Sequence, residues 1–235
     1  KEQTNFPNPW PGGTWHLRDI VDRQKISAWA TLDLAARNKE QVLRNMYLKG
    51  KHQTERGANG TPKAFVVPVS GQHDPLTTRK MIQNLLNQGV EVLQSAAGFS
   101  QDGKAYAPGT YVVSMAQPKM GVVRWMLGRT FYPDNEYTRD NDGNPIRPYD
   151  MAGDVMAEFM GVSVDPTNTK VTAELTKVAS AEPAAGTVAK GGTLSFSGRL
   201  NDSWRAANLL FAKGTTVRRV DKASGALHVG DYIVT

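Results

Sequence analysis

Hydrophobic positions in the first fifty residues predict one long helix. They recur at steps of three, four or seven residues along a single stripe, made of Leu17, Val21, Ala28, Leu32, Ala35, Val42 and Met46. Thr14 is a suitable N-cap for a helix that begins near Trp15, and Gly50 is its expected end. Residues 51–62 are then a loop. Residues 1–62 are therefore predicted to be a connecting segment and a long helix, whose apolar stripe either packs in a core or meets a partner.

After residue 62 the pattern changes to short apolar runs that alternate with amphipathic stretches. Ala64–Val69 has the composition of a buried strand, and Tyr111–Val113 is another strand candidate. Asp74-Pro75 is a strong helix start, because the carboxylate can cap free amide groups and proline suits the first helical position. Units of strand, helix and strand usually place their strands in parallel. We therefore predict an α/β fold for residues 63–164, with a partly parallel sheet and flanking helices, preceded by the long N-terminal helix.

Two stretches of the chain share one order of expected elements, which points to an internal repeat. Residues 64–113 and 193–234 both give a strand, a capped helix, a glycine stop, a strand, a hairpin and a strand. Gly89 and Gly214 are the two glycine stops. Any strand–helix–strand unit would give a similar order, so a true repeat and a coincidence are both open.

The composition shifts again after residue 164. Residues 165–192 are rich in Ala, Thr, Gly and Pro and are the predicted linker. Residues 193–235 then form a second, incomplete α/β unit. Because the chain opens at Lys1 and stops in strand-like residues, we expect a fragment of a longer protein.

The overall composition excludes several classes of chemistry. The chain has 235 residues and no cysteine, which excludes disulfides, thiolate zinc sites and cysteine nucleophiles. Its formal net charge is +6, which permits an acidic partner without requiring one. No apolar run approaches the roughly 18 residues that a membrane-spanning helix needs, so no membrane partner is expected.

One group of residues permits hydrolase chemistry. Ser70 lies three residues before His73-Asp74, directly after an expected strand. A Ser/His/Asp arrangement at the carboxyl edge of a sheet can supply a nucleophile, a base and an orienting carboxylate. No Gly-x-Ser-x-Gly elbow accompanies these residues, and Asp74 already has a role as a helix cap. The helix start is the preferred interpretation, and a small hydrolase using Ser70, His73 and Asp74 is the alternative.

Metal and nucleic-acid sites receive weaker support. His52 and Glu55 have the His-x-x-Glu spacing of a zinc pair, but they lie in an expected loop without a third ligand, so no metal or other cofactor is predicted in this chain. An acidic loop region resembles a loose calcium site without the ligand order of an EF-hand; it contains Asp134, Glu136, Asp140, Asp142 and Asp150.

Basic residues gather around the expected end of the long helix without interleaved aromatics; they are Arg37, Lys39, Arg44, Lys49, Lys51 and Arg56. A solvated helix face is therefore favoured over a nucleic-acid site, and a basic ligand-binding module is a further alternative.

Five strings of the sequence carry a resemblance to a known family. They are Asn8-Pro9-Trp10-Pro11-Gly12-Gly13-Thr14-Trp15-His16-Leu17-Arg18-Asp19-Ile20-Val21-Asp22, Glu55-Arg56-Gly57-Ala58, Gln72-His73-Asp74-Pro75, Gly109-Thr110-Tyr111-Val112-Val113-Ser114-Met115-Ala116-Gln117-Pro118 and Arg147-Pro148-Tyr149-Asp150. Together they resemble the region downstream of the catalytic domain in large bacterial zinc carboxypeptidase-like proteins. The likeness covers most of the chain. It implies a connecting helix followed by an α/β domain described as glutamine amidotransferase-like.

This resemblance implies an accessory role rather than catalysis. The zinc ligands and the catalytic glutamate of such proteins lie upstream of this region, so zinc is expected only in the catalytic domain. The cysteine nucleophile of an amidotransferase has no counterpart here. One departure follows Asp150, where the family continues Val-Thr-Gly-Trp and this chain has Met151, Ala152 and Asp154. The expected function is a non-catalytic accessory or scaffold region of an exported zinc carboxypeptidase-like peptidase, periplasmic or secreted, with the catalytic domain of the same parent protein as its partner.

Overall fold

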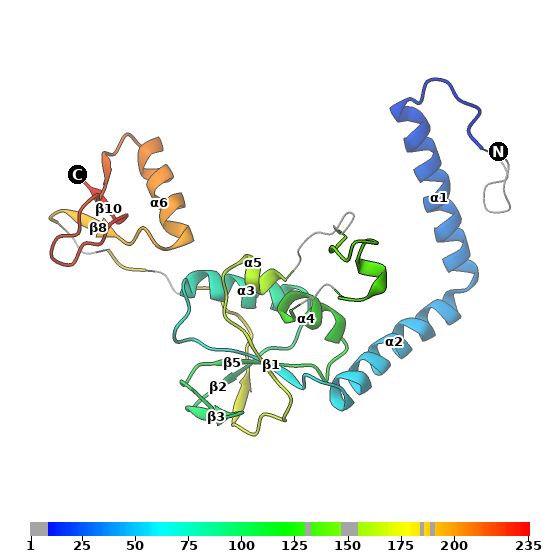
Figure 1. Cartoon of the computed structure of the whole chain (residues 1–235), viewed down its shortest axis with the longest axis horizontal. Helices are drawn as coiled ribbons and strands as arrows, with labels where there is room; N and C mark the ends of the chain where they lie inside the picture. Colours follow the sequence, from blue (N-terminus) through cyan, green and yellow to red (C-terminus); the bar gives the residue numbers. More distant parts are fainter. Residues whose placement is uncertain (1–8, 130–132, 147–154, 184–185, 189–190) are drawn as a thin grey trace. The chain divides into compact units, whose positions relative to one another are not determined.

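The computed structural model describes residues 9–129, 133–146, 155–183, 186–188 and 191–235. The chain divides into two compact units, Lys1–Lys49 and Gly50–Thr235. The order of its elements can be followed in Figure 1. Its α-helices are α1 (Leu17–Arg37), α2 (Lys39–Asn59), α3 (Pro75–Asn87), α4 (Met120–Leu127), α5 (Met156–Phe159) and α6 (Asn201–Ala212), with one short 3₁₀ helix, η1 (Glu136–Thr138). Its strands are β1 (Ala64–Val67), β2 (Leu93–Ser95), β3 (Phe99–Gln101), β4 (Lys104–Tyr106), β5 (Tyr111–Ser114), β6 (Asp165–Thr167), β7 (Leu175–Lys177), β8 (Leu194–Phe196), β9 (Val217–Arg219) and β10 (Tyr232–Val234).

The predicted N-terminal helix is present, but it consists of two helices that meet at Asn38. This residue has φ −110° and ψ 27°, outside the helical region, and its backbone N–H donates to the carbonyl of Leu34 at 3.1 Å. The backbone N–H of His16 donates to Asp19 Oδ2 at 2.9 Å at the other end of α1. His16 is therefore the N-cap of α1, and the assignment of Thr14 to that position was wrong. Among the described residues, no helix is long and apolar enough to cross a membrane.

The predicted end of the helix at Gly50 was also wrong, because α2 continues to Asn59. A glycine inside a helix costs only about 1 kcal/mol relative to alanine, so it does not by itself end one. The predicted loop after Gly50 is therefore mostly helical. Of the six basic residues named above, Arg37 is the last residue of α1, and the other five are spread along α2 instead of gathering at its end. Two of the six pair with acids one turn away, Arg37 with Asp33 and Lys51 with Glu55.

A five-stranded sheet organises the larger unit, in the order β6-β1-β5-β2-β7. Every neighbouring pair in it is antiparallel, so the predicted partly parallel sheet is wrong, although the mixed α/β class is confirmed. β1 and β2, which are joined through α3, do run in the same direction, but β5 lies between them and pairs with both. The order of elements along the chain is the same whether β1 and β2 pair directly as parallel strands or β5 lies between them. The sequence pattern therefore could not distinguish the two arrangements.

The core lies between this sheet and helices α3, α4 and α5, which cover one of its faces (Figure 1). Phe65 and Val67 reach it from β1, Met81 and Leu85 from α3, and Val123 from α4. Each of these side chains is at most 3% exposed. Alternate residues of the same strands point to the opposite face of the sheet, where the candidate site lies.

The segment predicted as a linker, residues 165–192, contributes both edge strands of this sheet. β6 pairs with β1, and β7 pairs with β2. These strands are three residues long and mostly polar, so they show no hydrophobic alternation. Backbone hydrogen bonds to an existing strand hold them, and composition does not report such bonds.

The three-stranded sheet repeats the arrangement of β1, β5 and β2. Its order is β8-β10-β9, with α6 joining β8 to β9 and with β10 between them, antiparallel to both. Gly89 after α3 and Gly214 after α6 have φ values of 75° and 74°. The residues that follow them, Val90 and Thr215, donate their backbone N–H groups to the carbonyls of Leu85 and Leu210, both at 3.0 Å. The repeated order of strand, helix, glycine stop and two further strands is thus confirmed, whereas the predicted hairpin of the second copy is reduced to an isolated bridge between Ser224 and Leu227. In addition, no described strand lies outside β8 or β9.

Candidate functional site

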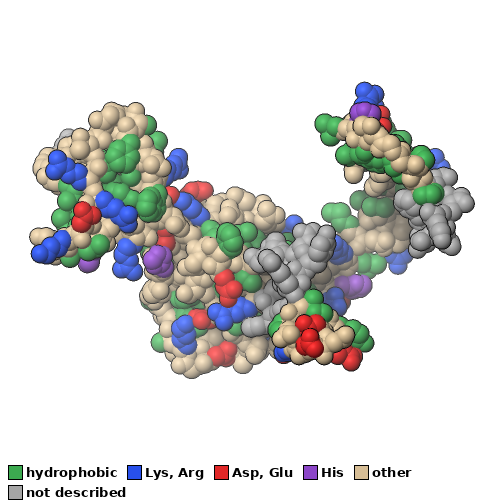
Figure 2. Space-filling model, turned by 45° about the horizontal axis from the view of Figure 1, so that its top comes forward, with side chains coloured by type: hydrophobic (Ala, Val, Ile, Leu, Met, Phe, Trp, Pro, Cys, Tyr) green, Lys and Arg blue, Asp and Glu red, His purple; other side chains and the backbone are tan. Residues whose placement is uncertain are grey.

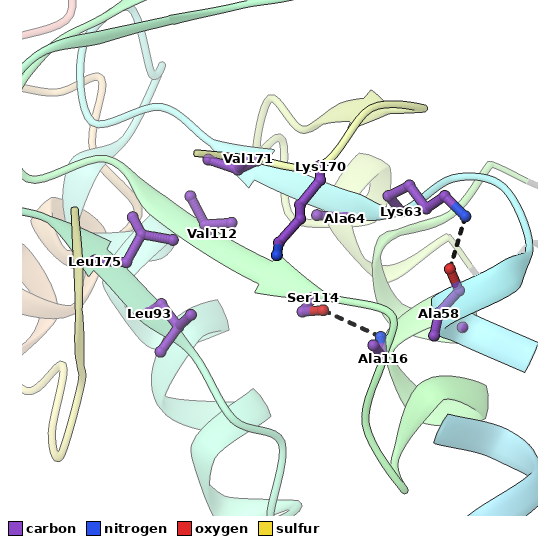
Figure 3. Close-up of a pocket in the computed structure, with 11 residues that line it drawn as sticks. Ala58, Lys63, Ala64, Leu93, Val112, Ser114, Ala116, Lys170, Val171 and Leu175 are labelled. Carbon is purple, nitrogen blue, oxygen red and sulfur yellow. Dashed lines mark hydrogen bonds between the residues drawn. The ribbon is translucent and has the colours of Figure 1, made fainter. Parts of the chain in front are cut away.

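A cavity of about 540 Å³ lies on the face of the five-stranded sheet that the helices leave uncovered (Figure 3). Ala64, Leu93 and Val112 form its floor from β1, β2 and β5. They alternate with core residues along the same strands and therefore point away from the helices. The described residues that line it are Gly57, Ala58, Lys63, Ala64, Leu93, Val112, Ser114, Ala116, Lys170, Val171 and Leu175. The cavity is thus an apolar hollow with few polar groups at its margin.

One wall of the cavity depends on a glycine near the end of α2. A Cβ atom placed on Gly57 would lie 1.8 Å from the carbonyl oxygen of Met115, in the chain that follows β5. No other residue type permits this approach, since real Cβ atoms do not come so close to a backbone oxygen. Gly57 therefore brings Ala58 beside Ala116 at the margin of the cavity.

Two lysines line the cavity, and they point in different directions. Lys63 Nζ donates to the backbone carbonyl of Ala58 at 2.7 Å and lies away from the floor (Figure 3). Lys170 extends across the cavity toward Ser114 on β5 (Figure 3). The hydroxyl of Ser114 accepts the backbone N–H of Ala116 at 3.1 Å. None of the described residues that line the cavity is acidic, so among them the lysines set its electrostatic potential.

A polar network fixes the chain just before Lys170. The hydroxyls of Thr167 and Thr169 donate to the two carboxylate oxygens of Asp102 at 2.6 and 2.7 Å. These hydrogen bonds, that from Thr167 first, lower the pKa of Asp102 below its ordinary value, so this carboxylate stays ionised and keeps its acceptor role at neutral pH. Gln101 also donates to Thr167 at 2.8 Å. The turn between β3 and β4 is thereby tied to the segment that carries Lys170.

The residues of the predicted hydrolase arrangement are close in sequence but are not joined by hydrogen bonds. Ser70 and His73 are exposed, and Asp74 is 3% exposed. The carboxylate of Asp74 accepts four hydrogen bonds, from the N–H groups of Leu76, Thr77 and Asn201 and from the hydroxyl of Thr77. It is the helix cap that the sequence predicted, with Pro75 at the first helical positions. A smaller cavity of about 290 Å³ near this edge of the sheet is lined by Gln72, Thr78 and Arg79 among others, and by none of the three predicted residues.

The predicted metal candidates lie apart from any larger group of ligands. His52 and Glu55 are exposed on α2, where a loop was expected. Within the described residues no three His, Asp or Glu side chains are placed to hold one metal ion. In the acidic loop, Asp134 pairs with Arg139 at 2.7 Å, and Asp140 accepts the N–H groups of Asp142 and Asn144. Asp150 lies outside the described residues.

The cavity was not foreseen from the sequence. Lys170, the one cation among its described lining residues that is not bound to a carbonyl, lies in the segment that composition assigned to a linker. One signal was present, because β5 is apolar at Tyr111, Val112 and Val113 without alternation, which indicates apolar surroundings on both faces of a strand. No family model, no curated protein and no solved structure matches this chain.

Proposed function

We propose that this chain is a non-catalytic accessory region that packs against the catalytic domain of an exported zinc carboxypeptidase-like peptidase. Two observations support the proposal: the five sequence strings described above, and an apolar surface on the N-terminal helices that no described residue of their unit covers. The second observation carries the argument. None of the 21 residues of α1 is buried.

Part of the exposed apolar surface follows the stripe that the sequence marks, while Ile26 and Leu34 are exposed on other sides of α1. Leu17, Val21 and Leu32 are 77%, 50% and 62% exposed, and they lie on one side of α1. Hydrophobic side chains are visible along these helices in Figure 2. Monomeric proteins rarely leave a continuous apolar strip of this kind in water, so it is typical of a surface that packs against another domain.

Local interactions contribute little to the stability of α1. Its ion pairs, Arg18–Asp22 and Asp33–Arg37, are both 2.9 Å long and exposed. Such pairs contribute a few tenths of a kcal/mol each, and most helix stability in proteins comes from packing. Covering the exposed parts of these three aliphatic side chains would contribute about 3 to 6 kcal/mol. A partner domain would therefore be the main source of stability for this helix.

Two tryptophans of the first of the five strings form an aromatic cluster at the start of α1. The rings of Trp10 and Trp15 lie 4.6 Å apart in an edge-on arrangement. The guanidinium of Arg23 lies 4.9 Å from the centre of the Trp15 ring. Both indoles remain more than 40% exposed. Tryptophan and arginine often supply most of the binding energy in interfaces, so this cluster is a second exposed group that a partner domain can contact.

The alternative of a small hydrolase lacks comparable support. Its orienting acid would be Asp74, whose carboxylate oxygens are already occupied by amide and hydroxyl donors of α3 and α6. Using Asp74 to orient His73 would require breaking helix caps.

The first test reads the gene upstream of the codon for Lys1. We expect a catalytic domain with a His-x-x-Glu zinc pair, and a start codon directly before Lys1 would refute the proposal. The second test mixes the chain with that catalytic domain and measures association by sedimentation velocity. Leu32→Glu is expected to weaken association at least tenfold, while Ile26→Glu is the matched control, because Ile26 is 68% exposed on the opposite side of α1.

The same samples test the absence of catalysis in this chain. Purified chain alone is expected to release no amino acid from the carboxyl terminus of peptides and to hold no stoichiometric zinc after dialysis. Peptide cleavage by the chain alone, or equal loss of association in both variants, would contradict the proposal.

A further inference from the structure

We propose that the cavity on the open face of the five-stranded sheet binds a carboxylate carried on an apolar chain. The inference is independent of the proposed accessory role, because it concerns the Gly50–Thr235 unit and not the surface of α1. It rests on three features of the cavity as its described residues form it: an apolar floor, the cation of Lys170, and a backbone frame that holds both in place.

The apolar floor supplies the binding energy for a hydrocarbon chain. Ala64, Leu93, Val112 and Leu175 come from four neighbouring strands and meet in one hollow (Figure 3). Its volume of about 540 Å³ is within the range of small-molecule sites in proteins. Each methylene group that leaves water for such a surface contributes up to about a fourfold gain in affinity.

Lys170 selects the charge of the ligand. Its side chain reaches over the floor, and the described residues offer its ammonium group no hydrogen bond or ion pair. Lys63 cannot serve equally, because its Nζ is bound to the carbonyl of Ala58. With no acid in the lining, a ligand cation would meet only repulsion, whereas a carboxylate would form a charge-assisted hydrogen bond with Lys170.

The frame around Lys170 reduces the entropic cost of binding. Thr167 and Thr169 are held by Asp102, and β6 is held by β1, so the chain that leads to Lys170 is already ordered. Val171, the next residue, lines the cavity as well. Groups that are held in place before binding lose less freedom when the ligand arrives.

The test is a titration of the full chain with octanoate, followed by amide shifts in two-dimensional NMR. Octanoate is expected to bind saturably and to shift the amides of Ala64, Leu93 and Val112, with octylammonium and octanol at least tenfold weaker. Affinity is expected to rise along the series acetate, butyrate and octanoate. Equal affinity for octanoate and octylammonium, or shifts confined to other parts of the chain, would overturn the proposal.

Two matched variants isolate the role of the cation. Lys170→Gln is expected to reduce octanoate affinity about tenfold. Lys177→Gln removes a lysine that pairs with Glu91 at 3.1 Å and does not line the cavity, and it is expected to leave the affinity unchanged. Both side chains are exposed, so neither change threatens the fold. Unchanged affinity in Lys170→Gln, or equal losses in the two variants, would refute the assignment.

A last comparison identifies the source of the carboxylate. An acetylated peptide that ends in Leu-Leu with a free carboxyl group is titrated beside octanoate and beside the amidated form of the same peptide. Tighter binding of octanoate assigns the cavity to free acids, and tighter binding of the free peptide assigns it to chain termini. Equal binding of the amidated and free peptides, together with no octanoate binding, would contradict both assignments.

Discussion

The carboxylate of Asp74 joins the two copies of the repeat by capping one helix from each. Its Oδ1 accepts the N–H groups of Leu76 and Thr77 in the first turn of α3, at 2.9 and 3.0 Å. Its Oδ2 accepts the N–H of Asn201, the first residue of α6, at 2.9 Å. Asn201 Nδ2 in turn donates to Thr77 Oγ1 at 2.9 Å. Because helix N-termini carry partial positive charge, one buried anion stabilises both ends at once.

Replacing this carboxylate should destabilise the larger unit more than any nearby polar change. Asp74→Ala is expected to lower the free energy of unfolding by about 2 to 4 kcal/mol, because it leaves amide groups of two helices without an acceptor. Asn201→Ala is the control: it keeps the backbone N–H and removes only the bond to Thr77, at a cost of about 1 kcal/mol. Urea unfolding followed by tryptophan fluorescence measures both. A smaller loss in Asp74→Ala than in Asn201→Ala would contradict this assignment.

The lowered pKa of the Asp74 carboxyl group predicts that the stability of the protein depends on pH. Burial alone would raise the pKa of Asp74, but the hydrogen bonds from Asn201, Thr77 and Leu76 lower it below its ordinary value. A lowered pKa in the folded state means that the stabilising contribution is complete above the unfolded-state pKa of about 4 and is lost as the pH falls through the folded value. The stability difference between the wild type and Asp74→Asn should therefore be constant from neutral pH to about pH 5 and shrink in more acidic solution. A difference that persists unchanged into strong acid would disprove the role of the ionised carboxylate.

Replacing either of two glycines of α2 by alanine should change the stability of the protein, with a loss at Gly57 and a gain at Gly50. At Gly57 a Cβ atom would lie 1.8 Å from Met115 O and 2.3 Å from Met115 C, so α2 would have to move away from the chain after β5. Gly57→Ala is expected to cost about 3 kcal/mol, as for strong overpacking. At Gly50 the nearest atom is Pro118 Cβ at 3.6 Å, an ordinary contact. Gly50→Ala is therefore expected to add about 0.5 to 1 kcal/mol through helix propensity.

Thermal unfolding of both variants measures these changes. The Gly57 variant should also bind octanoate more weakly, because Ala58 would leave the margin of the cavity. Loss of stability in Gly50→Ala, or an unchanged melting temperature in Gly57→Ala, would show that the packing of α2 differs from that described.

Features that depend on interactions between neighbouring residues could be predicted from the sequence. The cap at Asp74 depends on residues within one turn, and the glycine stops at Gly89 and Gly214 depend on a single backbone conformation. These predictions were confirmed because the interactions that determine them lie within a few residues. The prediction that Gly50 ends the helix was wrong, because one glycine lowers helix stability only slightly. The packing of Gly57 against Met115 involves residues far apart in the chain, so no local pattern could predict it.

Pairing between distant strands was beyond the reach of the pattern. β5 enters between β1 and β2, and β6 joins the edge of β1 from a segment with no strand signal. Both facts depend on hydrogen bonds between residues far apart in the chain. The cavity depends on them in turn, because Lys170 follows β6 in the chain and Leu175 lies on β7. A site assembled by edge strands and one exposed lysine leaves no motif in the sequence.

A buried hydroxyl on β2 provides the last prediction. Ser95 is 3% exposed, and its Oγ has no hydrogen-bond partner among the described residues. Its backbone N–H donates to the carbonyl of Thr110, whose own hydroxyl donates to Ala107 O at 2.8 Å. An unpaired buried hydroxyl costs about 1 to 3 kcal/mol, whereas a paired one contributes about 1 kcal/mol. Ser95→Ala should therefore raise the free energy of unfolding by about 1 kcal/mol, and Thr110→Val, its neighbour with a bonded hydroxyl, should lower it by a similar amount. Guanidinium unfolding measures the free energy of unfolding of both variants and distinguishes the two signs. If Ser95→Ala loses as much stability as Thr110→Val, the prediction is wrong and the Ser95 hydroxyl has a hydrogen-bond partner in solution, such as a buried water molecule.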